Sequence, residues 1–144
     1  MGVDITLNFL GRTEEAVDFY CESIGAECFH ITRFRNASVD LKTDPKLADK
    51  IFHATFVVSS TRIMASDVGC TSDQSDHCSA VFNGFALALS AEDTDQAEQF
   101  FQRLSAGGNV QLPMTETFFA KRYGIVTDRF GVTWKVILEK QLPT

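Results

Sequence analysis

The stretch TEEAVDFYCESIGAE (residues 13–27) is followed, at an offset of 81 residues, by the related stretch TDQAEQFFQRLSAGG (residues 94–108). Each has apolar side chains at helical spacing, acidic residues near its start and glycine near its end, which is typical of a capped amphipathic helix. We therefore expect a helix in each half of the chain, the first capped by Thr13 and ended by Gly25. The coinciding positions are Thr13 with Thr94, Ala16 with Ala97, Phe19 with Phe100 and Tyr20 with Phe101.

Short apolar runs flank each predicted helix, and their length and alternation are typical of strands. The offset of 81 lays the first strand of one half on that of the other, and we expect it to superpose the closing hairpins as well. A duplicated βαβββ unit explains this order, with a ferredoxin-like or other α/β sandwich as the alternative. The expected strands span residues 5–9, 28–35, 52–58 and 62–66, then 85–90, 110–114, 121–127 and 132–138.

Length and composition indicate a single domain made of two modules. The chain has 144 residues, 44% of them hydrophobic, which is enough to bury a core without disulfides or metal. The segment between the two patterns is polar and lacks apolar periodicity. We expect modules at 1–68 and 82–140, joined by a polar loop at 69–81.

The charge of the chain excludes several classes of partner. A formal net charge of −6 argues against nucleic acid, because affinity for phosphates comes largely from Lys and Arg. No apolar run approaches the ~18 residues of a membrane span, and no signal peptide is evident. We expect a cytoplasmic protein with no nucleic-acid or membrane partner, whose four cysteines are reduced thiols.

Three motifs resemble one known superfamily. They are the T-x-x-A-x-x-F-Y helix followed by I-G-A, the stretch RIMASD (residues 62–67), and the Y-G-x-V-x-D-x-F-G-x-x-W pattern of residues 123–134. Together they resemble the vicinal-oxygen-chelate (glyoxalase/bleomycin-resistance/dioxygenase) superfamily, in particular its PhnB-like branch. The resemblance implies an α+β fold in which two βαβββ modules form a curled mixed sheet around a cup-shaped cavity. It also implies a homodimer.

Metal-dependent members of this superfamily carry His, Glu or Gln ligands on the first and fourth strands of each module. The corresponding positions here fall near Ile5 or Thr6, at Phe85, at Lys135 and near Asp67. Isoleucine, threonine and phenylalanine are poor ligands, and an ammonium group repels a cation. Only Asp67 offers a carboxylate, so the resemblance argues against the usual metal mechanism.

His53 and Asp67 form the remaining candidate pair for a ligand or, if a metal is bound at all, for a metal. The length of the turn between their strands decides whether they share a face. A two-residue turn places them on opposite faces of the sheet, whereas a three-residue turn at residues 59–61 places them opposite each other. The sequence leaves both turns open. The alternatives are a polar surface histidine and a strand-end aspartate that bonds loop amides.

Further candidates lie in the second half of the chain. Phe85 and Trp134 are candidate ligand contacts, with core positions as the alternative. Tyr123 with Lys135 or Lys121 is a candidate for orienting an anionic ligand, with exposed strand charges as the alternative. Glu116 is the candidate general base if it is buried beside phenylalanines, because burial raises the pKa of a carboxyl.

These observations favour a small-molecule-binding protein that lacks most of the usual metal ligands. The alternative is a metal-dependent lyase, isomerase or dioxygenase with relocated ligands, His53 and Asp67 among them. A structural or regulatory partner protein is a third class. The sequence does not decide whether the chain is an enzyme, and it assigns no cofactor beyond the divalent metal of the alternative.

Overall fold

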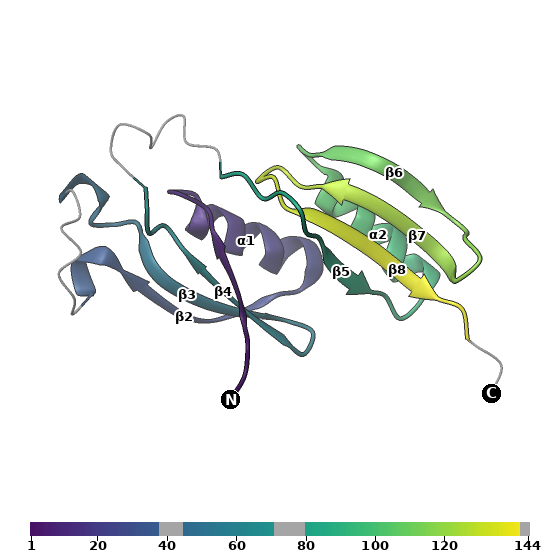
Figure 1. Ribbon diagram of the computed structural model, residues 1–144, viewed down its shortest axis with the longest axis horizontal. Coiled ribbons are helices and arrows are strands. Elements are labelled where there is room, and N and C mark those ends of the chain that lie inside the picture. The colour runs from purple at the N-terminus through teal and green to yellow at the C-terminus, as the bar shows by residue number, and fades with distance from the viewer. Residues whose placement is uncertain (38–44, 71–79, 142–144) are drawn as a thin grey trace. The chain divides into compact units, whose positions relative to one another are not determined.

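The computed structural model describes residues 1–37, 45–70 and 80–141, and the chain divides into two compact units, Met1–Ala80 and Val81–Thr144 (Figure 1). The predicted polar loop at 69–81 falls largely outside the described residues. No helix in the described ranges is long and apolar enough to cross a membrane.

The first unit is a four-stranded mixed sheet with one helix. Its strand order is β1-β4-β3-β2, in which β1 runs parallel to β4 and the other neighbours are antiparallel. Two short 3-10 turns, Phe34–Asn36 and Pro45–Leu47, follow β2. The elements are β1 (Ile5–Asn8), α1 (Thr13–Ile24), β2 (Glu27–Arg33), β3 (Ile51–Val58) and β4 (Thr61–Ser66).

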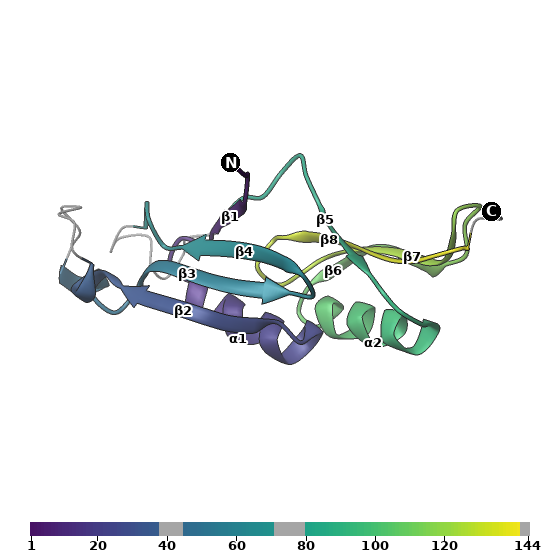
Figure 2. The same ribbon diagram turned by 90° about the horizontal axis from the view of Figure 1, so that it is seen from below.

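The second unit repeats this plan, with the order β5-β8-β7-β6 and a parallel β5–β8 pair. Figure 2 shows α1 along one face of the first sheet and α2 along one face of the second. The duplicated βαβββ fold is therefore confirmed. The elements are β5 (Leu87–Ser90), α2 (Thr94–Ser105), β6 (Asn109–Thr115), β7 (Ala120–Thr127) and β8 (Thr133–Glu139).

The offset of 81 residues holds for the helices, which begin at Thr13 and Thr94, but it is wrong for the strands. The first strands begin at Ile5 and Leu87, an offset of 82, because one residue fewer separates strand from helix in the second unit. The closing hairpins begin at Ile51 and Ala120, an offset of 69. The first unit carries a long insertion between its second and third strands, which explains the difference.

The two helices are capped in different ways. At α1 the side chain of Arg12, the N-cap residue, makes no capping bond, and Thr13 is the first helical residue rather than the cap. At α2 the Asp93 carboxylate accepts the backbone N–H of Gln96 at 2.7 Å, which satisfies a helix-end donor directly. Gly25 ends α1 in the left-handed conformation, as predicted.

Each unit buries its own core between helix and sheet. In the first, Tyr20 of α1 is fully buried and stacks on Phe56 of β3, with ring centroids 5.9 Å apart. In the second, Ala97 and Leu104 of α2 and Val126 and Val136 of the sheet are fully buried. Alternate residues of each strand face away from that core. These outward residues define the helix-free face of each unit.

Candidate functional site

The helix-free face of the first unit carries two histidines on neighbouring strands. His30 lies on β2 opposite Thr55, and His53 lies on β3 opposite Thr32. The two imidazole centroids are 6.0 Å apart. Each ring nitrogen Nε2 contacts the hydroxyl of a threonine two residues along its own strand, at 2.6 Å for His30 and 3.0 Å for His53. The result is a polar, hydrogen-bonded patch.

The hairpin register separates His53 from Asp67. Val58 pairs with Thr61, so the turn has two residues, and Ala54 pairs with Ala65 on the helix side. Paired residue numbers then sum to an odd value, and His53 and Asp67 project from opposite faces. The structure therefore does not bring this predicted pair together.

The carboxylate of Asp67 is a buried hub of backbone hydrogen bonds, with the residue only 1% exposed. Its Oδ1 accepts from Gly11 N at 2.8 Å, from Thr13 N at 3.1 Å and from Thr13 Oγ1 at 2.6 Å. Its Oδ2 accepts from Ile51 N at 2.9 Å. Asp67 thus caps α1 from 54 residues away and ties the helix to β3. These contacts are those of the alternative given above, a strand-end aspartate that bonds loop amides.

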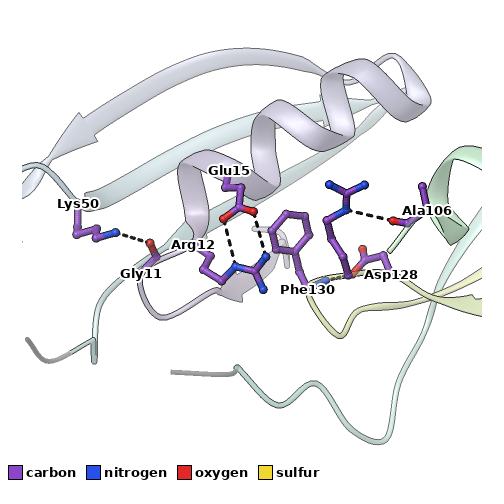
Figure 3. A network of polar contacts seen from close by, with 8 residues as sticks. Gly11, Arg12, Glu15, Lys50, Ala106, Asp128 and Phe130 are labelled. Atoms are coloured by element: carbon purple, nitrogen blue, oxygen red, sulfur yellow. Dashed lines mark hydrogen bonds and ion pairs between the residues drawn. The ribbon is translucent and has the colours of Figure 1, made fainter. Parts of the chain in front are cut away.

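A polar recess of about 250 Å³ adjoins Asp67 in the first unit. Its charged walls are bonded to neighbouring groups. Lys50 Nζ donates to the Gly11 carbonyl at 2.8 Å (Figure 3), Arg33 forms an ion pair with Glu14, and Arg33 also donates to the Asp49 carbonyl at 2.7 Å. These contacts hold the walls of the recess together.

The helix-free face of the second unit combines apolar and polar side chains, and Lys135 lies on its inner strand β8. Lys135 of β8 lies between Ala88 of β5 and Ile125 of β7. Tyr123 pairs with Ile137, which makes Tyr123 and Lys135 diagonal neighbours on this face. All but Ala88 are half-buried. The structure brings the predicted residues Tyr123 and Lys135 together.

Trp134 lies on the opposite side of the same strand, in the core, and is 2% exposed. Its indole N–H donates to Asp128 Oδ2 at 2.9 Å. Asp128 Oδ1 also accepts from the backbone of Phe130 at 2.9 Å (Figure 3) and of Val132 at 3.1 Å. A buried turn explains the spacing of Asp128, Phe130, Gly131 and Trp134. Trp134 occupies the core position that was given above as the alternative.

Phe85 and Glu116 lie outside both helix-free faces. Phe85 precedes β5, is 43% exposed and contacts the Phe82 ring edge-on at 6.4 Å. The Glu116 side chain is 69% exposed and pairs with Lys140 at 3.0 Å. The burial that the general-base role requires is therefore not found at Glu116.

The first and fourth strands of each unit show what a metal would meet on the helix-free faces. The side chains there include no imidazole or thiolate, and their single carboxylate is that of Glu139 at the end of β8. Imidazole, thiolate and carboxylate are the groups that divalent transition metals prefer. Within residues 1–37, 45–70 and 80–141, no group of three or more His, Cys, Asp or Glu side chains is close enough to hold a metal ion. The residues at these positions are Thr6, Asn8, Arg62, Met64, Ser66, Ala88, Ser90, Thr133, Lys135, Ile137 and Glu139.

The sequence interpretation missed His30. It recognised the alternation of residues 28–35 as a strand but did not align that strand with its partner. The long insertion before β3 hid the pairing, and a register shift beside Phe29 hid it further. Two histidines on strands that are predicted to pair were the available signal.

These arrangements define a protein of the glyoxalase/bleomycin-resistance fold. The crystal structure of protein PA1353 from Pseudomonas aeruginosa matches with a TM-score of 0.80 and 30% identity, covering 98% of this chain and 99% of that one. A glyoxylase/bleomycin resistance protein/dioxygenase domain from Frankia shares the fold at a TM-score of 0.63 and 17% identity, covering 96% of this chain and 94% of its own.

Residues 2–137 match the family described as 3-demethylubiquinone-9 3-methyltransferase, and the chain belongs to this PhnB-like family. Protein YjdN of Escherichia coli is 31% identical over 146 residues, which cover 96% of this chain and 95% of that protein. The structure of a putative 3-demethylubiquinone-9 3-methyltransferase, PhnB protein, from Bacillus cereus has the same fold, with a TM-score of 0.76, 23% identity and coverage of 96% and 99%.

Proposed function

We propose that the chain is a cytoplasmic, homodimeric small-molecule-binding protein that works without a metal at the family's ligand positions. One observation carries the proposal: the helix-free face of the second unit combines half-buried Ile125 and Ile137 with the polar groups of Tyr123 and Lys135. Binding sites for small molecules are mostly apolar, with a few convergent polar groups that fix orientation.

The chemistry of the metal positions supports the proposal that the chain works without a metal there. The fourth strand of the second unit offers Lys135, whose ammonium group would repel a cation. The fourth strand of the first unit offers Met64, a soft thioether that suits few divalent ions. The Asp67 carboxylate is already used by backbone donors.

A thermal-shift screen tests the proposal. We expect no stabilisation by Ni²⁺, Mn²⁺, Zn²⁺ or Fe²⁺ and a clear rise in Tm with some organic compounds. A ligand at 100 times its Kd adds about 2.7 kcal/mol, which corresponds to several degrees for a chain of this size. S-adenosylmethionine belongs in the panel, because the family's description names a methyltransferase. Metal-dependent turnover of a substrate would overturn the proposal.

The histidine patch favours one competing function, a metal-dependent enzyme with relocated ligands. His30 and His53 are 6.0 Å apart at their ring centroids, which suits two imidazoles that share a metal ion. Two ligands are fewer than the three or four that most protein zinc sites use. This alternative predicts near-stoichiometric metal in freshly purified protein, lost in His53→Ala, and metal analysis of both proteins decides it.

The edge of the first sheet supports the homodimer. Strand β2 pairs only with β3 among the described strands. Its residues Phe29 and Ile31 are 66% and 39% exposed. An exposed apolar edge strand is a template for pairing with another chain, and proteins generally cover such edges.

A further inference from the structure

The ammonium group of Lys135 has no counter-charge among its nearest neighbours on its face of the sheet, and Glu139 lies four residues further along β8. Its cross-strand neighbours are Ala88 and Ile125, and the next residues on the same face of β8 are Thr133 and Ile137. None of these side chains is acidic. In the described part of the chain, Lys135 forms no hydrogen bond or ion pair with another side chain.

Arg122 and Lys140 of the second unit differ in this respect. Arg103 and Lys121, which form no ion pair in the described part of the chain, are exposed to water. Arg122 pairs with Glu98 on α2, and Lys140 pairs with Glu116. A half-buried cation beside apolar side chains loses part of its hydration, and a hydrogen-bonded anion restores the lost stabilisation. Lys135 therefore has a charge that its surroundings leave uncompensated, on the face that the proposed function uses.

Tyr123 supplies a second donor beside Lys135. The two residues are diagonal neighbours on adjacent antiparallel strands. Such neighbours have Cα atoms about 7–8 Å apart, which is within reach of long side chains. The Tyr123 ring contacts the Phe119 ring edge-on at 5.1 Å, which limits its rotation. An ammonium and a phenolic hydroxyl held on rigid strands can donate to two oxygens of one anionic group.

We propose that the ligand of the second unit is an organic anion, a carboxylate, sulfonate or phosphonate with an apolar body. Its charged group binds Lys135 and Tyr123, and its apolar body lies on Ile125 and Ile137. This inference rests on the proposed function and adds the charge and shape of the ligand. Inorganic phosphate lacks the apolar body and binds more weakly.

Two fluorescent probes with the same aromatic body distinguish the effect of charge on affinity from the effect of the aromatic body. The anionic probe is 8-anilinonaphthalene-1-sulfonate, and the uncharged probe is N-phenyl-1-naphthylamine. We expect the full chain to bind the sulfonate about tenfold more tightly, a difference of about 1.4 kcal/mol, because the sulfonate accepts a charge-assisted hydrogen bond that the uncharged probe lacks. Lys135→Met should lose that tenfold preference, whereas its affinity for the uncharged probe should stay within about twofold.

Matched variants keep the result interpretable. Lys135→Arg retains the charge and should retain the preference. Lys46→Met makes the same change of charge at an exposed lysine of the first unit and should also retain it. Lys135→Gln serves as a second uncharged variant if Lys135→Met does not fold. Equal losses in Lys46→Met and Lys135→Met would mean a general charge effect and would overturn the inference.

The remaining outcomes distinguish this inference from the function on which it rests. If both probes bind equally and Lys135→Met changes neither affinity, the face binds apolar ligands. The proposed function then stands, and the inference of an anionic ligand is wrong. If neither probe binds the folded chain, the binding face itself is wrong and both proposals fail. Displacement of the sulfonate by inorganic phosphate at similar concentration would contradict the claim that the apolar body of the ligand contributes to binding.

Discussion

The carboxylate of Asp67 connects three segments of the first unit: the loop at Gly11, the start of α1 at Thr13 and the start of β3 at Ile51. A helix start leaves several backbone N–H groups without partners, and here a residue distant in sequence supplies the acceptor. Sequence patterns identify local caps such as Asp93, because the cap lies next to the helix that it caps. They do not identify Asp67 as a cap, because its role depends on how β4 ends beside the helix.

Replacing Asp67 should therefore lower stability rather than affect binding alone. We expect Asp67→Ala to cost about 3 kcal/mol, from a lost helix cap and buried donors left without an acceptor. Urea denaturation measures the change. Asp95→Ala, at an exposed position in the first turn of α2, is the control and should cost well under 1 kcal/mol. A loss below 1 kcal/mol for Asp67→Ala would contradict the assigned role.

Cys21 on α1 offers a test of local electrostatics. Burial raises the pKa of its thiol, and the neighbouring Cys28 and Asp18 raise the pKa further. Since the thiolate is the reactive form, iodoacetamide should alkylate Cys21 more slowly in the folded chain than in urea at pH 8. Cys28→Ser removes one of the raising charges and should speed alkylation of Cys21. Peptide mass spectrometry over a pH series measures both rates, and equal folded and unfolded rates would refute the shift.

At the scale of elements, the β3–β4 turn sets which residues share a face. Ser59 adopts a positive φ of 56°, a conformation that costs a non-glycine residue roughly 1 kcal/mol. Ser59→Gly relieves this strain but also gives the unfolded chain more freedom, so the net gain in stability should be at most about 0.5 kcal/mol. The matched change at Ser60, which is not in this conformation, should be neutral or destabilising. Thermal unfolding compares the two, and a loss of stability in Ser59→Gly would argue against the two-residue turn.

Gly124 of β7 lets α2 approach its sheet closely. A Cβ atom there would lie 2.7 Å from Phe101 Cε2 and 2.5 Å from Met114 Sδ. Gly124→Ala should therefore destabilise the chain by about 1–3 kcal/mol through overpacking. Gly2→Ala, where a Cβ atom meets nothing within 4 Å, is the control and should be neutral. Partial recovery in Gly124→Ala with Phe101→Leu would identify the clash, and no recovery would point to another cause.

The types of the elements could be predicted from the sequence, because each depends on local periodicity and caps. The strand pairing could be predicted only in part. Strand β6, which contains Pro113, is an edge strand with one register shift before Leu112 and another between Leu112 and Thr115, and at such a position a missing N–H costs little. The pairing of His30 with Thr55 was not visible, since it depends on how the chain returns after a 17-residue connection between Arg33 and Ile51.

At the scale of the whole molecule, the fold class and family could be predicted because duplicated elements and the closing motif extend over most of the chain. The candidate site was harder. Tyr123 and Lys135 were found because they lie on one short hairpin, where register follows from the alternation of residues. Trp134 was a candidate ligand contact with a core position as the alternative, and the same alternation turns it toward the core. A binding face thus becomes predictable only when the register of its strands is known.

The proposed homodimer gives the last test, because an association changes stability by mass action. If two copies pair through β2, the Tm should rise with protein concentration, and light scattering should give twice the mass of 16.0 kDa. Ile31→Lys places a charge on that edge and should yield a monomer with a concentration-independent Tm. Val110→Lys makes the same change at a similarly exposed position on β6 and should leave the dimer intact. Dissociation by Val110→Lys but not by Ile31→Lys would move the interface to the second unit, and a monomeric native chain would exclude the dimer.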